Sequence, residues 1–83
     1  MNTSKLYEKI KNNPQNVRFR DLCRIVEAFG FRYRGGRGSH RVYAKEGVVE
    51  ILNFQEVKRM AKPYQVRQFL KIIEVYKLGI GED

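Results

Sequence analysis

The chain has 83 residues, enough for one small domain, and 42% of them are hydrophobic, which argues for a modest core and against disorder. The only cysteine, Cys23, excludes a disulfide framework and a cysteine-based metal site, and it favours a reducing compartment. The first residues are polar and lysine-rich, unlike a signal peptide, and no stretch approaches the roughly 20 apolar residues of a membrane span. We therefore expect a cytoplasmic protein without membrane contacts.

The net charge of +8 is concentrated in two segments. Residues 31–45 and residues 57–73 each hold five lysines or arginines and no acid, so the rest of the chain sums to −2. Such clustering is typical of a surface that binds a polyanion such as RNA. The alternative is a solvated surface that only keeps a small protein soluble.

Residues 1–16 are predicted to form an appendage with a short helix. Residues 4–11 place Leu6, Tyr7 and Ile10 on one helical face, with Thr3 or Ser4 as the N-cap. The "NNPQN" run at residues 12–16 then breaks the helix. A second unit is predicted over residues 17–83.

The second unit begins with a helix in "FRDLCRIVEAFGF", residues 19–31. Its apolar residues follow the i, i+3, i+4, i+7 spacing of one helical face, and Gly30 suits the C-terminal cap. Cys23 lies in this helix and is expected to be buried. A last helix is predicted from Pro63 to about Gly79, preceded by a basic loop, "QEVKRMAK".

Between these helices the hydrophobic pattern changes to a period of two residues, which predicts three strands at residues 31–35, 40–45 and 48–54. The turns are "GRGS" and a tight hairpin at Gly47. Tyr43 should share a face with Arg41 and Lys45, either to stack on a base or to make a cross-strand aromatic contact. The predicted fold is α+β and like a double-stranded-RNA-binding domain: a three-stranded antiparallel sheet with two helices on one face (αβββα), plus the N-terminal helix.

His40, the only histidine, directly follows the glycine-rich turn. No metal-ligand cluster, nucleotide-binding loop or Ser–His–Asp pattern is evident, so we expect no metal and no cofactor. An imidazole can take a proton from a ribose 2′-OH or give one to a leaving 5′-oxygen. The alternative is a surface histidine without a role. Asp21, Glu27 and Glu50 could pair with His40, but spacing does not decide among them.

Arginines and glycines beside His40 suit a phosphate, because guanidinium groups pair with it and glycine lets the backbone approach. Two further cations flank the start of the last helix, whose N-terminus attracts anions; plain solvation is the alternative for them. The residues expected to hold RNA phosphates are Arg37, Gly38, Ser39, Arg41, Lys62 and Arg67, with the backbone of Gly36 assisting.

The segments "FRDLCRIVEAFGF", "RGSHRVY", "ILNF" and "KPYQVRQFLKIIEVY" resemble the HicA family of toxins, small ribonucleases of bacterial toxin–antitoxin pairs. The resemblance covers roughly residues 17–78, and its most specific part is Gly38-Ser39-His40. It implies the same double-stranded-RNA-binding-like fold, ribosome-independent mRNA cleavage and a catalytic histidine at His40. It also implies a HicB-type antitoxin that covers the active site. Residues 1–16 and the "LNFQEVKRM" stretch depart from shorter members.

The leading hypothesis is a metal-independent endoribonuclease toxin in which His40 is the general acid or base and the product is a 2′,3′-cyclic phosphate. A second proton-transfer group or water must take part, and the sequence does not name it. A non-catalytic RNA-binding module is the main alternative. A basic face that docks an acidic protein partner is another.

Overall fold

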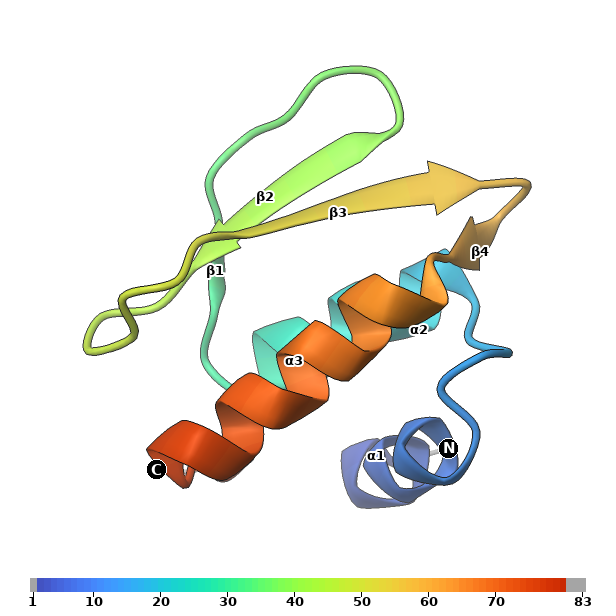
Figure 1. The fold of residues 1–83 in the computed structure, drawn as a ribbon. Coiled ribbons are helices and arrows are strands. Elements are labelled where there is room, and N and C mark those ends of the chain that lie inside the picture. The colour runs from blue at the N-terminus through green and yellow to red at the C-terminus, as the bar shows by residue number, and fades with distance from the viewer. Residues whose placement is uncertain (1, 81–83) are drawn as a thin grey trace.

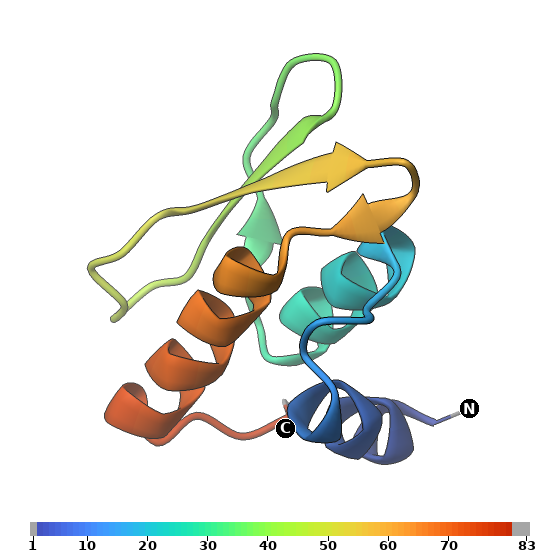
Figure 2. The ribbon, with the colours of Figure 1, turned by 45° about the vertical axis from the view of Figure 1, so that its right-hand side comes forward.

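A computed structural model describes residues 2–80, so Met1 and the end of the second predicted unit, residues 81–83, lie outside the description. The four strands form one antiparallel sheet in the order β1-β2-β3-β4. Helices α2 and α3 cover one face of this sheet, and α1 packs beyond them (Figure 1, Figure 2). The elements are α1 (Thr3–Asn12), α2 (Phe19–Ala28), β1 (Arg32–Tyr33), β2 (His40–Ala44), β3 (Leu52–Val57), β4 (Met60–Ala61) and α3 (Pro63–Tyr76). The predicted α+β class is confirmed.

The core lies between the sheet and the two helices that cover it. Every second residue of β2 and β3 points toward the helices, and the apolar stripes of α2 and α3 meet them. Ring contacts such as Phe29–Phe69, with centroids 5.7 Å apart, tie the layers together. The fully buried residues of this core are Leu22, Ile25, Val26, Tyr43, Leu52, Phe54, Val66 and Phe69.

Helix α1 forms a third layer against α2. Leu6 and Ile10 are buried, and the ring of Tyr7 meets that of Phe29 edge-on at 5.0 Å. A ten-residue helix is marginal alone, so this packing stabilises it. The N-cap is Asn2, whose side chain accepts from the Lys5 N–H at 2.9 Å, rather than Thr3 or Ser4.

The sheet has a fourth strand where a basic loop was expected. β3 continues to Val57, and β4 returns after a turn made by Lys58 and Arg59. Both turn residues have positive φ, 51° and 69°, the geometry of a two-residue type I′ hairpin. The usual Asn-Gly of such turns is missing, so the pattern did not reveal the hairpin.

The connection between β2 and β3 is longer than the tight hairpin that Gly47 suggested. β3 begins at Leu52 rather than at Val48, and the side chain of Tyr76 in α3 holds the connection. The Tyr76 hydroxyl accepts from the Val49 N–H at 3.3 Å and donates to Glu50 at 2.8 Å. This tertiary anchor overrides the strand preference of the valines.

Helix α3 ends at Tyr76, before the predicted stop at Gly79. Lys77 takes the left-handed conformation with φ 55°, and the Leu78 N–H donates to the Ile73 carbonyl at 3.0 Å. The helix therefore closes with a Schellman-type cap in which a lysine stands where glycine is usual. At α2 the predicted glycine cap is confirmed, since Gly30 has φ 93°.

Candidate active site

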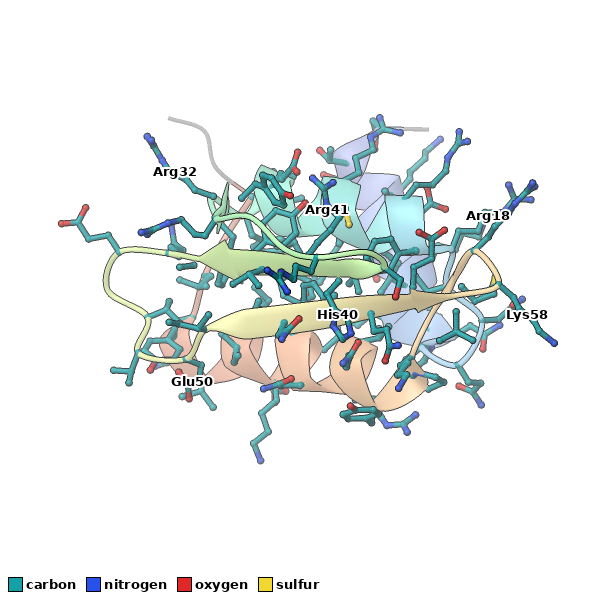
Figure 3. All side chains as sticks on the ribbon, turned by 90° about the horizontal axis from the view of Figure 1, so that it is seen from above. Arg18, Arg32, His40, Arg41, Glu50 and Lys58 are labelled. Atoms are coloured by element: carbon teal, nitrogen blue, oxygen red, sulfur yellow. The ribbon has the colours of Figure 1, made fainter. Side chains whose placement is uncertain are left out.

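The face of the sheet opposite the helices is uncovered in the part of the chain that the structure describes (Figure 1). His40 pairs with Gln55 across β2 and β3, and Val42 pairs with Asn53. Their strand neighbours Tyr43, Leu52 and Phe54 point to the core, so these four side chains point outward. Figure 3 views the sheet from this side and labels His40. Both His40 and Asn53 are exposed.

The glycine-rich segment holds His40 at the start of β2. The His40 N–H donates to the Arg37 carbonyl at 2.9 Å, which closes a tight turn, and Gly38 in that turn has φ 57°. Gly36 passes so close to β2 that a Cβ there would collide with the His40 carbonyl oxygen. The Ser39 carbonyl accepts from the Glu56 N–H at 2.9 Å, which extends the β2–β3 ladder. The loop and both strands therefore fix the backbone of His40.

Among residues 2–80, the side-chain hydrogen-bond partner of the His40 imidazole is Asn53, a residue that the sequence pattern did not point to. The Nδ1 atom lies 3.3 Å from Asn53 Oδ1. When Nδ1–H donates to this oxygen, the neutral ring carries its proton on Nδ1 and offers the lone pair of Nε2. The sequence shows Asn53 as a polar residue between two apolar ones in "LNF". Its place beside His40 follows only from the register of β2 and β3.

Arg41, predicted beside His40 at the phosphate, points to the other side of β2, toward α2 (Figure 3). Its guanidinium carbon lies 4.2 Å from the centre of the Tyr33 ring, and its Nε donates to the Tyr43 hydroxyl at 3.2 Å. Tyr43 is fully buried and donates to Glu27 at 2.7 Å. Base stacking by Tyr43 is therefore wrong, and the cross-strand aromatic contact, here with Tyr33, is what forms.

The two cations predicted at the start of α3 do not lie together, because Lys62 precedes the helix and Arg67 lies within it. Lys62 is the N-cap residue, one turn before Gln65, whose buried side chain accepts from the Gln55 N–H at 2.9 Å. This contact anchors the first turn of α3 to the strand residue opposite His40. Arg67 lines a cavity of about 430 Å³ together with residues of α1, away from the open sheet face.

Among residues 2–80, none of the three candidate carboxylates forms a hydrogen bond or an ion pair with His40. Glu27 accepts from Tyr43, Glu50 accepts from Tyr76, and Asp21 lines a cavity beside α1. The same part of the chain has no group of three or more His, Cys, Asp or Glu side chains that could hold a metal ion. None of its helices combines the length and the apolar character needed to cross a membrane.

The other reactive side chains near β2 are held neutral. Burial raises the pKa of the Cys23 thiol, and the residue is buried as expected. Burial also raises the pKa of Tyr43, and its hydrogen bond to Glu27 adds to this effect. His40 is therefore the exposed group of this region that is chemically suited to proton transfer.

Comparison with known proteins places the chain in a family. A protein-family model described as "HicA toxin of bacterial toxin-antitoxin" matches residues 19–75, from the start of α2 almost to the end of α3. In the same comparisons, no curated protein and no solved structure matched the chain. The match includes the whole sheet and His40 and leaves out α1. The chain belongs to the HicA family of toxins of bacterial toxin–antitoxin systems.

Proposed function

We propose that this toxin is an endoribonuclease that cleaves mRNA with His40 as its proton-transfer group. The observation that carries the proposal is the contact between His40 Nδ1 and Asn53 Oδ1 on the open face of the sheet. It leaves Nε2 of the exposed imidazole directed away from Asn53 and available to a substrate. The family match supports a toxin role, and the resemblance to the HicA ribonucleases implies mRNA cleavage.

In the proposed reaction, Nε2 takes the proton of a ribose 2′-OH. The 2′-oxygen then attacks the adjacent phosphorus, the bond from phosphorus to the 5′-oxygen breaks, and a 2′,3′-cyclic phosphate forms. The leaving 5′-oxygen receives a proton from water or from a second group. Asn53 acts as a positioning residue, because it holds the imidazole in the tautomer that can accept at Nε2.

The scissile phosphate is proposed to bind at the turn before β2. Arg37 and the exposed backbone of Gly38 and Ser39 flank His40 there, and a guanidinium offsets charge on the phosphate oxygens. Lys62, at the start of α3, is assigned to the same RNA-facing region. Arg41 is assigned instead to holding β1 and β2 in place, and the position of Arg67 gives it no part in this site.

Replacement of His40 tests this proposal. In a cleavage assay with a labelled single-stranded RNA, His40→Ala should lose about 10²- to 10⁴-fold in rate, the usual contribution of a general acid or base. The exposed side chain makes one long hydrogen bond, so the melting temperature and RNA binding should change little. His40→Gln serves as a second variant that keeps a polar side chain.

Cleavage by His40→Ala at the wild-type rate would refute the catalytic assignment. If neither protein cleaves RNA and both bind it with a steep salt dependence, the non-catalytic RNA-binding module is correct. Product analysis adds an independent readout, because the proposed mechanism requires a 2′,3′-cyclic phosphate end.

A HicB-type antitoxin is the proposed protein partner, since the family acts in toxin–antitoxin pairs. An antitoxin that covers the open sheet face would exclude RNA from His40. The product of the adjacent reading frame should therefore inhibit cleavage and protect this face from hydrogen exchange. If an acidic partner binds while the toxin alone binds no RNA, the basic surface serves protein docking instead.

A further inference from the structure

Four cations meet at the end of the sheet where β3 turns into β4. Two belong to the turn itself, and two belong to the start of α2, about 40 residues earlier in the chain. They surround a cavity of about 460 Å³. Its lining residues are Arg18, Arg20, Glu56, Lys58, Arg59 and Met60. We call Arg18, Arg20, Lys58 and Arg59 the basic cluster.

Backbone contacts hold the two segments of the basic cluster together. The Phe19 N–H donates to the Arg59 carbonyl at 2.9 Å, and Arg18 forms an antiparallel bridge with Met60. Figure 3 shows Arg18 and Lys58 at the same end of the sheet, opposite the end marked by Arg32 and Glu50. The cations therefore converge because of the fold rather than because of sequence proximity.

The backbone of the turn points to a functional reason for its cations. Lys58 and Arg59 both have left-handed φ values, which strain residues with a Cβ, and Asn-Gly would suit this turn better. Both side chains are exposed rather than packed in the core, so burial does not compensate for this strain. A strained backbone that retains two adjacent cations is the kind of outlier from which a binding role is inferred.

The basic cluster lies close to the proposed cleavage site. Gln55 is paired with His40, and the Glu56 N–H donates to Ser39, while Glu56 also lines the cavity of the cluster. Lys58 follows Gln55 by three residues, which corresponds to about 10 Å along a strand. An RNA strand with its scissile phosphate at His40 can therefore reach the cluster within a few nucleotides.

We propose that the basic cluster binds phosphates of the RNA strand that flanks the scissile bond. The inference rests on the proposed function and names where the substrate is held beyond His40. The guanidinium groups of Arg18, Arg20 and Arg59 suit bidentate contacts with phosphate oxygens, and Lys58 adds a point charge. Binding in the cluster does not depend on base identity, because phosphates carry no sequence information.

The double variant Lys58→Asn, Arg59→Gly tests this proposal, because it removes two positive charges and also relieves the backbone strain of the turn. Its melting temperature should equal or exceed that of the parent. Affinity for a fluorescent single-stranded RNA, measured by anisotropy in the His40→Ala background, should fall about tenfold. The log–log salt slope should shrink by about 1.4, since two contacts are lost at about 0.7 each.

A matched control removes the same amount of positive charge, two cations, from residues outside the basic cluster. Lys5 lies in α1, and Lys77 stands in a left-handed position at the far end of α3, with φ 55°. The double variant Lys5→Gln, Lys77→Gly should keep the affinity and the salt slope of the parent. Equal weakening by both double variants would mean that net charge alone is responsible, and unchanged binding by the turn variant would also overturn the proposal.

Parallel cleavage assays with His40 intact separate this inference from the proposed function. If the wild type cleaves RNA and the turn variant has an unchanged KM, the basic cluster assignment is wrong while the nuclease proposal holds. If the wild type binds RNA without cleaving it, the nuclease proposal fails. A loss of affinity in the turn variant would still support phosphate binding by the cluster.

Discussion

The guanidinium of Arg41 is held by three side chains from three different elements. It stacks on Tyr33 of β1, donates to the hydroxyl of Tyr43 in β2, and lies 4.0 Å from a carboxylate oxygen of Glu27 in α2. His40, the preceding residue, faces the opposite side of the strand. Strand alternation thus gives two adjacent residues separate tasks: one is exposed for chemistry, and the other joins the sheet edge to a helix.

This separation predicts different effects for two arginine substitutions. Arg41→Ala removes partners of Tyr43 and Glu27, so the free energy of unfolding should fall by about 1 kcal/mol in urea titrations. Arg37→Ala, in the exposed turn, should leave stability unchanged and reduce RNA cleavage more than Arg41→Ala does. The assigned roles would be contradicted if Arg37→Ala lowered the free energy of unfolding more than Arg41→Ala does, or if Arg41→Ala reduced RNA cleavage more than Arg37→Ala does.

The buried hydroxyl of Tyr43 predicts a pH-dependent difference in stability. Burial, followed by the hydrogen bond to Glu27, raises the pKa of Tyr43, so the folded state binds this proton more tightly than the unfolded chain. Stability from this group is complete below the ordinary tyrosine pKa of about 10 and is lost as the pH rises above it. The free energy of unfolding should therefore drop more between pH 9 and pH 11 for the wild type than for Tyr43→Phe. Parallel pH profiles of unfolding free energy for the two proteins would contradict the raised pKa of Tyr43 in the folded state.

At the scale of elements, α1 is joined to the rest of the protein by buried apolar side chains. Ile10 is 2% exposed and Leu6 is 3% exposed. Ile10→Ala should therefore cost about 2–5 kcal/mol in unfolding free energy, the usual effect of truncating a core isoleucine. Lys9→Ala, at the exposed neighbouring position, is the control and should melt like the wild type. An unchanged melting temperature for Ile10→Ala would mean that α1 is only loosely docked.

The elements that the sequence predicted are those with a strong local period. Helices α2 and α3 have regular apolar stripes, and β2 alternates over its whole length. β4 has two residues and no period, and its turn lacks the usual glycine. The start of β3 depends on a hydrogen bond that the Val49 N–H donates to the hydroxyl of distant Tyr76. His40 was predicted as the candidate residue from its place after the glycine turn, whereas Asn53 needed the strand register.

At the scale of the whole molecule, the three layers place the stabilising core and the exposed candidate site in different regions. Within residues 2–80 the outer face of the sheet is uncovered, α2 and α3 fill the middle, and α1 lies on the side of these helices away from the sheet (Figure 2). The family match spans the sheet and the middle layer and therefore includes the strands that carry the open face. The basic cluster extends that face at one end, where the chain from α2 meets the β3–β4 turn.

The pairing of His40 with Asn53 also bears on how much of the chain must be synthesised before the proposed site can form. The two residues come from different strands, so the imidazole gains its partner only after β3 has been translated and has paired with β2. The sheet in turn packs on Phe69 and Val66 of α3, which follow the sheet in the chain. The proposed catalytic geometry therefore needs β3 and α3 in addition to His40, and a chain that stops before them lacks it.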